Sequence, residues 1–247
     1  MPEEQSFVAH LDELRRRLIR VLLVIAVAVI VGMLIANPII RYIQESGPAA
    51  DFSLKVFSPW DAVRIYMNVA LAVALVIALP YAMLQIWGFV KPGLRREEQV
   101  AAVKYVPFVF VLALLGLAFS YFIVFPFAIL FSTRLSGSLG LEEMFGISQY
   151  FSFLFNIVLP ITVLFELPAV VMFLTKIRLL NPRRLGQFRK FAYFILFVLG
   201  ALVTPPDILS AILVTIPMMG LYEISVLLSR IVYSKQQAAD TAALKET

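Results

Sequence analysis

The stretch LIRVLLVIAVAVIVGMLIA, residues 18–36, contains one charged residue, Arg20, and is otherwise apolar. A transmembrane helix needs about 20 mainly apolar residues, because each advances the helix by about 1.5 Å through a hydrocarbon core about 30 Å thick. Three arginines precede the stretch, as in a signal peptide. The stretch is longer than the apolar core of a signal peptide, about 7–15 residues, and no clear cleavage site ends it. We therefore interpret it as a retained membrane span.

Five more apolar runs follow, which a single-span or secreted protein would not contain. We predict an all-α membrane protein with six transmembrane helices, at about residues 18–38, 68–90, 105–131, 150–175, 191–203 and 208–229. The fifth is short, at 13 residues, and only residues 204–207 separate it from the sixth, which indicates a tight helical hairpin. Pro38 is expected to break the first helix. Residues 1–235 then form one transmembrane domain, and residues 236–247 form a tail expected to be disordered.

The composition supports a membrane protein and argues against several kinds of chemistry. Hydrophobic residues make up 61% of the 247 residues and charged residues 15%, against about 45–50% and about 25% in soluble domains. Cysteine is absent and His10 is the only histidine, which argues against disulfides, thiolate chemistry, a His-based metal site and a Ser-His-Asp triad. We expect no metal or cofactor. The net charge of +5 comes from basic residues beside the apolar runs, so we do not expect nucleic-acid binding.

The distribution of Lys and Arg predicts the orientation in the membrane. Of the 21 basic residues, 17 lie in the N-terminal segment, the second and fourth loops and the C-terminal segment, and four lie in the other loops. Cytoplasmic loops carry the excess of Lys and Arg in membrane proteins. Both termini are therefore predicted to be cytoplasmic.

Glu166 is the charged residue that most needs an explanation. It lies about 13 Å inside the fourth span, where a carboxylate costs at least about 2.5 kcal/mol and should face protein or a wet cavity. Thr162 lies one turn away on the same face, and Pro160 and Pro168 flank the site and can bend the helix. Two interpretations remain: a hydrogen-bonded residue that joins helices, or a residue that contacts a substrate or partner.

Other charged residues have structural explanations from spacing alone. Asp12 and Arg16, like Glu13 and Arg17, are four residues apart and can pair on an interfacial helix. Capping-box spacing relates Ser58 to Asp61 before the second span, and Thr204 to Asp207 before the sixth. Glu97 and Glu98 can be caps or surface charges.

Seven motifs occur in order within the stretch from residue 7 to about residue 230. They are HLDELRRR (10–17), SP (58–59), FVKPGLRREE (89–98), FSYF leading to Pro126 (119–126), FELP (165–168), TPPD (204–207) and IP through LYE (216–223). Each is weak alone, but together on six spans they resemble the TatC family, the signal-receptor subunit of the twin-arginine protein translocase.

The resemblance implies a cupped six-helix bundle in the cell membrane that binds twin-arginine signal peptides of folded precursors for export driven by the proton-motive force. It also implies assembly with TatA- and TatB-type single-span proteins at the last two spans. Carried over by motif, the signal-binding residues are Glu13, Arg15, Arg17, Phe89, Pro92, Leu94, Glu97 and Glu98, and either of the two adjacent glutamates can carry the main contact. The resemblance also marks Glu166, Pro59 and Asp207 as functional.

Two other functions compete with a translocase receptor. In a proton- or ion-coupled secondary transporter, Glu166 would be the coupling site near the membrane midplane. However, the sequence shows no convincing internal repeat and few polar residues in its spans. An intramembrane enzyme would need His, Cys or a second acid near Glu166, and the sequence supplies none of these. The sequence therefore favours a binding and assembly subunit rather than an enzyme.

Overall fold

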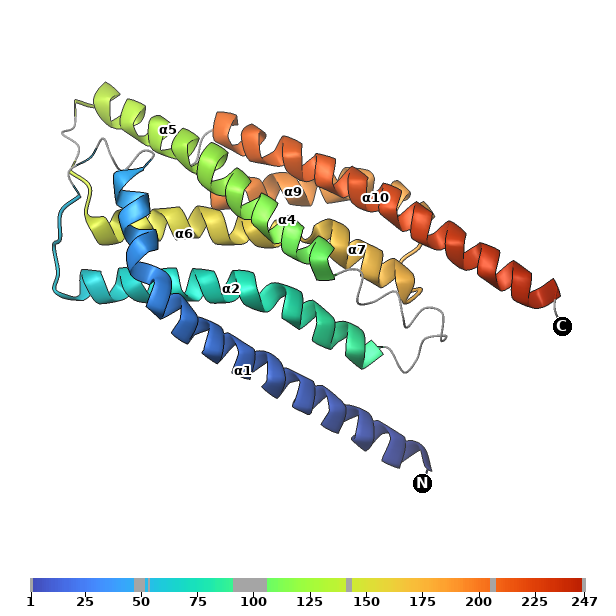
Figure 1. Cartoon of the computed structure of the whole chain (residues 1–247). Helices are drawn as coiled ribbons and strands as arrows, with labels where there is room; N and C mark the ends of the chain where they lie inside the picture. The colour runs from blue at the N-terminus through green and yellow to red at the C-terminus, as the bar shows by residue number, and fades with distance from the viewer. Residues whose placement is uncertain are drawn as a thin grey trace. The chain divides into compact units, whose positions relative to one another are not determined.

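The computed structural model describes residues 2–46, 52, 54–90, 106–140, 144–204 and 208–245. Every regular element in these ranges is a helix (Figure 1). The helices are α1 (Pro2–Glu45), α2 (Trp60–Val90), α4 (Val106–Phe119), the π-helical η4 (Ser120–Val124), α5 (Phe125–Ser138), α6 (Ile147–Leu164), α7 (Leu167–Lys176), α8 (Pro182–Gln187), α9 (Arg189–Val203) and α10 (Ile208–Lys245).

Five helical segments in the described residues are long and apolar enough to cross a membrane. They are Asp12–Glu45, Trp60–Phe89, Pro107–Ser138, Ile147–Lys176 and Ala211–Ala238. The first four and the sixth predicted spans overlap these segments. The fifth corresponds to α9, which has 15 residues and is shorter than the five segments. The chain is therefore a multi-pass membrane protein, and the membrane crossing of α9 remains a prediction.

The chain divides into two compact units, Met1–Val111 with Met144–Phe155, and Leu112–Glu143 with Asn156–Thr247. In the first unit, α1 and α2 lie side by side (Figure 1). A Cβ atom on Gly32 would lie 2.6 Å from the Ala70 carbonyl oxygen and 2.9 Å from its Cα atom. Because glycine faces alanine here, the two backbones approach closely, as is common between membrane helices.

The start of α2 confirms the capping box predicted at Ser58 and Asp61. The Asp61 carboxylate accepts hydrogen bonds from the backbone N–H groups of Phe57 at 3.0 Å and Ser58 at 2.9 Å, and the Ser58 hydroxyl accepts one from Trp60 N–H at 3.3 Å. Asp61 is buried. The carboxylate thus satisfies donors that helix geometry leaves without partners.

In the second unit, α10 packs against α7, α8 and α9. The hydroxyls of Thr175 and Ser229 lie 2.7 Å apart in the α7–α10 contact. A Cβ atom on Gly200 of α9 would lie 3.0 Å from the Thr215 hydroxyl oxygen of α10, so these two helices also approach closely. The predicted pairing of the fifth and sixth helical segments is therefore present.

Proline affects three predicted helices in different ways. Helix α1 continues through Pro38 to Glu45, so the prediction that Pro38 breaks it is wrong. Proline is tolerated inside membrane helices because neighbouring groups can satisfy the freed carbonyl. The third span contains the π-helical turn η4, which ends two residues before Pro126, and the missing N–H of this proline favours a wider turn. The fourth span is interrupted at Phe165 and Glu166, and Pro168 lies in the first turn of α7.

The tail predicted to be disordered, 236–247, is helical as far as α10 extends, which corrects that prediction. Two contacts within the second unit explain the difference. The Gln236 side chain donates a hydrogen bond of 2.7 Å to the Lys176 carbonyl, and Arg178 forms an ion pair of 2.9 Å with Asp240. These contacts supplement the high helix propensity of an alanine-rich segment.

Candidate functional site

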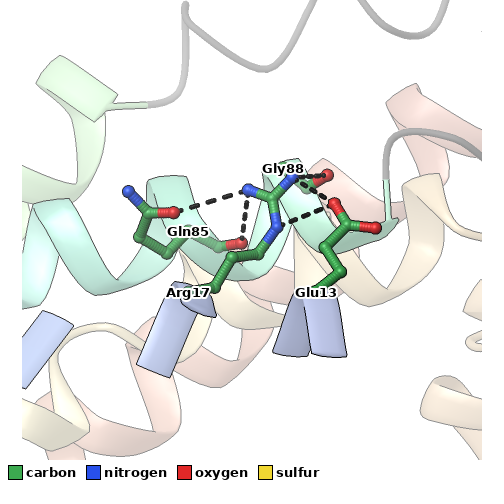
Figure 2. Close-up of polar contacts among 4 residues, drawn as sticks. All are labelled: Glu13, Arg17, Gln85 and Gly88. Atoms are coloured by element: carbon green, nitrogen blue, oxygen red, sulfur yellow. Dashed lines mark hydrogen bonds and ion pairs between the residues drawn. The ribbon is translucent and has the colours of Figure 1, made fainter. Parts of the chain in front are cut away.

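The guanidinium of Arg17 lies between two helices (Figure 2). Its Nε and NH2 groups donate hydrogen bonds of 3.0 and 2.6 Å to Oε1 of Glu13, one turn earlier on α1. NH2 also donates to the Gly88 carbonyl at 2.8 Å, and NH1 lies 3.4 Å from the carbonyl oxygen and the side-chain oxygen of Gln85. Arg17 therefore joins the predicted Glu13 pair to the end of α2.

The end of α2 is a favourable place for this cation. The last four carbonyl groups of a helix have no partner inside the helix, and the C-terminal end carries partial negative charge. The last turn of α2 contains no basic residue of its own. Arg17 supplies the missing cation from α1 through its bond to the Gly88 carbonyl.

Gly88 provides the space for the guanidinium. A Cβ atom at this position would lie 2.1 Å from NH1 of Arg17 and 2.9 Å from its Cζ atom. Since non-bonded atoms do not approach so closely, a side chain at residue 88 would displace the guanidinium. Glycine at this position therefore allows the guanidinium to approach the backbone of α2 closely.

The rest of this face of α1 is a network of charges beside a groove. Asp12 pairs with Arg15 at 2.8 Å and with Arg16 at 2.6 Å, and Glu13 pairs with Arg17 at 2.6 Å, which confirms the two predicted i,i+4 pairs. A groove of about 310 Å³ is lined by Asp12, Glu13, Arg16, Arg17 and Arg20. The network therefore presents both carboxylates and guanidinium groups to a ligand.

The structure brings only some of the predicted signal-binding residues together. Glu13, Arg15 and Arg17 belong to this network, and Phe89 is half-buried in the last turn of α2, next to Gly88. The other predicted members, Pro92, Leu94, Glu97 and Glu98, lie outside the described residues.

Sequence reasoning missed Gln85 and Gly88, although both contact Arg17. Two features of the sequence could have indicated them: the end of the second helix lacks a basic residue, and Gly88 directly precedes the motif at 89–98. Neither feature identifies which arginine binds there, because Arg17 is 71 residues from Gly88.

Glu166 is the second candidate site. It lies between α6 and α7 with 4% of its surface exposed, and neither carboxylate oxygen has a hydrogen-bond partner within the described part of the chain. Thr162 is fully buried, and its hydroxyl donates to the Val158 carbonyl at 2.7 Å. The predicted polar stripe thus consists of one carboxylate without a partner in those residues and one hydroxyl bonded to its own helix.

Helix α4 packs closely against this segment within the second unit. A Cβ atom on Gly116 would lie 2.8 Å from Cβ of Phe165 and 3.0 Å from Cα of Thr162, and the rings of Phe119 and Phe165 are 5.4 Å apart between centroids. The buried hydroxyl of Ser120 donates to the Gly116 carbonyl at 2.8 Å. Helix α4 therefore packs closely on the interruption at Glu166.

Pro59 and Asp207 are the two candidates predicted to lie on the outer side of the membrane. Pro59 is exposed in the turn that caps α2. Asp207 lies outside the described residues, so its predicted cap of the sixth helix stays a prediction. Thr204, its expected partner, donates from its hydroxyl to the Gly200 carbonyl at 2.9 Å and so satisfies a carbonyl near the end of α9.

A metal site has no candidate in the described ranges, where no three His, Asp or Glu side chains cluster. The charged side chains at the start of α1 instead form ion pairs and line a groove, as on a binding surface of a multi-pass membrane protein.

Comparisons with known proteins identify the family. The family model for Sec-independent protein translocase protein (TatC) matches residues 9–217. The chain is 40% identical to a TatC protein of Halalkalibacterium halodurans over 98% of this chain and 96% of that protein. It is also 40% identical to TatCy of Bacillus subtilis, over 97% and 94% of the two chains.

A crystal structure of the twin-arginine translocase receptor TatC supports the same family assignment. It superposes with a TM-score of 0.74 at 32% identity, covering 90% of this chain and 99% of that one. The chain is therefore a multi-pass membrane component of a protein-transport system. More specifically, the chain belongs to the TatC family of Sec-independent protein translocase proteins.

Proposed function

We propose that this chain is the receptor of a twin-arginine translocase and that Glu13 binds the arginine pair of a precursor's signal peptide together with Glu98. Family membership supports the general function, and a TatC of known structure is described as a receptor. It also favours protein transport over the alternative of an ion-coupled transporter that uses Glu166.

The proposal rests on the difference between the two oxygens of the Glu13 carboxylate. Both bonds from Arg17 go to Oε1, and Oε2 has no hydrogen bond or ion pair within the described residues. The Glu13 side chain is 35% exposed and lines the groove. A carboxylate oxygen has two acceptor positions, so Oε2 can receive a guanidinium while Oε1 stays bonded.

Arg17 acts as a positioning residue in this arrangement. Its side chain is only 20% exposed, and its bonds to Gly88 and Glu13 join α2 to the carboxylate. A side chain held in one geometry loses less rotational entropy when it binds a ligand. Arg17 therefore orients the Glu13 carboxylate, whose second oxygen stays available to a guanidinium of the ligand.

The proposal can be tested by crosslinking a photoreactive twin-arginine peptide to the full chain. We expect Glu13→Ala and Glu98→Ala each to weaken crosslinking, and the double variant to abolish crosslinking and export. Glu45→Ala is the matched control, because Glu45 is also exposed on α1 but lies at its other end. Unchanged crosslinking and export in the double variant would contradict the proposal.

The same proposal includes six membrane spans, with α9 as the fifth, both termini in the cytoplasm and location in the cell membrane. The charge distribution of 17 against four basic residues supports this orientation. Reporter fusions after residues 46, 140 and 204 should report the outer side, and a fusion after residue 245 the cytoplasm. A cytoplasmic signal after residue 204 would exclude α9 as a span.

TatA- and TatB-type single-span proteins are the proposed partners, docked at α9 and α10. Exposed apolar side chains support this location: Phe191, Phe194, Leu202, Ile212 and Ile216 are between 42% and 76% exposed. Copurification tests this docking site. TatA- and TatB-type proteins should copurify with the wild-type chain, and a double variant with Phe194→Asn and Ile216→Asn should no longer retain them.

Glu166, with Thr162, is proposed as an intramembrane polar site that serves transport rather than stability. The absence of a partner for its carboxylate in the described residues supports this role, because a residue that only joins helices would be hydrogen-bonded. Asp207 and Pro59 are proposed as functional residues of the outer side on the motif resemblance alone.

A further inference from the structure

Arg20 is an unusual member of the charged groove on α1. Asp12 is paired with Arg15 and Arg16, and Glu13 is paired with Arg17. Arg20 lines the same groove and is exposed, yet it has no hydrogen bond or ion pair with any residue that the structure describes. The groove therefore has more positive than negative charge, and the excess is at Arg20.

Arg20 also heads an exposed apolar stripe along α1. Intervals of three and four residues place Leu23, Val27, Ile30 and Leu34 on one helical face beyond Arg16 and Arg20. Their exposed fractions are 60%, 60%, 60% and 77%. The opposite face carries Gly32, which approaches Ala70 of α2 closely. The stripe thus points away from the α1–α2 contact.

The charged and apolar parts meet where the predicted first span begins, close to residue 18. At a rise of about 1.5 Å per residue, Arg16 and Arg20 are separated by about 6 Å along the axis. Two guanidinium groups at this spacing can donate hydrogen bonds to the oxygens of one phosphate. Lipid phosphates lie at the membrane boundary, and acyl chains lie beyond them in the direction of Leu34.

We infer that Arg16 and Arg20 bind the phosphate of an anionic phospholipid and that one of its acyl chains lies along the stripe from Leu23 to Leu34. Arg16 keeps its bond to Asp12 in this arrangement, because a guanidinium has five N–H donors. The inference does not depend on signal-peptide binding. It places a lipid in the same groove as Glu13, so headgroup charge would influence that site.

A partner helix is the competing occupant of the stripe. Such a helix would have to supply an acidic side chain at the membrane boundary to satisfy Arg20. A phospholipid brings its phosphate to that depth without any sequence requirement, and its chain matches a face that is apolar over four successive positions. The lipid is therefore the occupant that the charges and the apolar face favour.

Native mass spectrometry of the full chain in detergent tests the inference, with phosphatidylglycerol, phosphatidylcholine or glycerol 3-phosphate added. We expect phosphatidylglycerol to bind most tightly and Arg20→Gln to weaken it about fivefold or more. Arg20→Lys should recover part of the affinity, because it restores the charge but not the planar fork. Arg184→Gln is the matched control, since Arg184 is an exposed arginine on the short helix α8.

Four outcomes would overturn the inference. If Arg20→Gln and Arg184→Gln reduced phosphatidylglycerol binding equally, the lipid would be attracted to positive surface charge in general. Equal binding of the two phospholipids would remove the role of headgroup charge, and full competition by glycerol 3-phosphate would show a free-phosphate site without an acyl chain. A photoreactive group at residue 27 that crosslinks in membranes to a polypeptide rather than to lipid would establish a partner helix instead.

Discussion

At the scale of single residues, the same type of side chain has opposite surroundings at two sites. Glu13 is half-exposed and shares one oxygen with Arg17, whereas Glu166 is buried and has no bond to its carboxylate within the described residues. The first carboxylate is held by a cation and is open to a ligand, whereas the second is enclosed by packed helices. The two residues are therefore expected to respond differently to substitution.

Gly88→Ala should reduce signal-peptide affinity without unfolding the protein. The new methyl group would overlap the tip of the Arg17 side chain, which can move away, and alanine favours a helix more than glycine does. We expect thermal stability to change by less than about 1 kcal/mol, because the gain in helix propensity offsets part of the lost bond between Arg17 and Gly88. Peptide binding should weaken about threefold to tenfold, because the displaced Arg17 no longer orders the Glu13 carboxylate, an effect of about 0.5–1.5 kcal/mol. Both quantities can be measured on purified protein.

A double-mutant cycle provides the control for this prediction. If Gly88 acts through Arg17, then Gly88→Ala should have no further effect on peptide binding in an Arg17→Ala background. An equal additional loss in that background would show that Gly88 acts independently of Arg17.

Glu166→Gln should leave stability unchanged or raise it, because the substitution removes an ionisable group that has no bond in the described residues. If the carboxylate serves transport, export should nevertheless fall markedly. Thermal unfolding in detergent and an export assay separate these effects. A variant that loses about 2 kcal/mol or more of stability would instead indicate a structural hydrogen bond.

At the scale of helices, small residues determine where neighbouring helices meet. Gly32 faces the backbone of Ala70 in the α1–α2 contact, and Gly116 faces Phe165 and Thr162 in the α4–α6 contact. In both places a Cβ atom would meet atoms that cannot move independently of a helix. These glycines therefore differ from Gly88, which faces the end of a long side chain.

Gly32→Ala should destabilise the α1–α2 pair, by about 1–3 kcal/mol, because the added methyl would force the helices apart. Gly220→Ala is the matched control. Nothing lies within 4 Å of its Cβ position in α10, so only the gain in helix propensity remains, about 0.5–1 kcal/mol. Chemical denaturation of both variants checks the contrast, and similar effects in the two would contradict it.

Asp61→Ala should weaken the start of α2, because two backbone N–H groups would lose their acceptor. We expect a loss of about 1–2 kcal/mol. Faster hydrogen exchange at residues 57 and 58 would localise the effect, while exchange in the middle of α2 should not change. Uniformly faster exchange along α2 would instead indicate general unfolding.

At the scale of the whole molecule, the bilayer has to accommodate helices of very different lengths. Helix α2 has 31 residues and helix α9 has 15, which corresponds to about 46 Å and about 22 Å. The hydrocarbon core is about 30 Å thick. If α9 crosses the membrane, the bilayer must thin beside it or the helix ends must be hydrated.

Spin labels can test this mismatch. Labels at exposed positions 191 and 202 of α9 should both report contact with water, because the helix is too short to bury its two ends in lipid. Labels at exposed positions 71 and 77 of α2 should report lipid at both places. Labels at 191 and 202 that both report the hydrocarbon interior would contradict local thinning.

The local patterns in the sequence determine the apolar helices, the i,i+4 ion pairs and the cap of α2. Each depends on residues within a few positions, so spacing and composition are sufficient. Pro38 and the tail show the limit of this reasoning. Whether a proline or a polar segment ends a helix depends on contacts with other helices, such as the ion pair of Arg178 with Asp240.

Only the tertiary structure decides which partners these residues meet. The sequence predicts that Arg17 can pair with Glu13, but the bond from Arg17 to Gly88 joins residues 71 positions apart. Likewise, the apolar run at 18–36 predicts a span, whereas the packing of Gly32 on Ala70 decides which face of that span stays exposed. Solvation acts on each segment separately, but close packing is a property of pairs, and no single segment contains it.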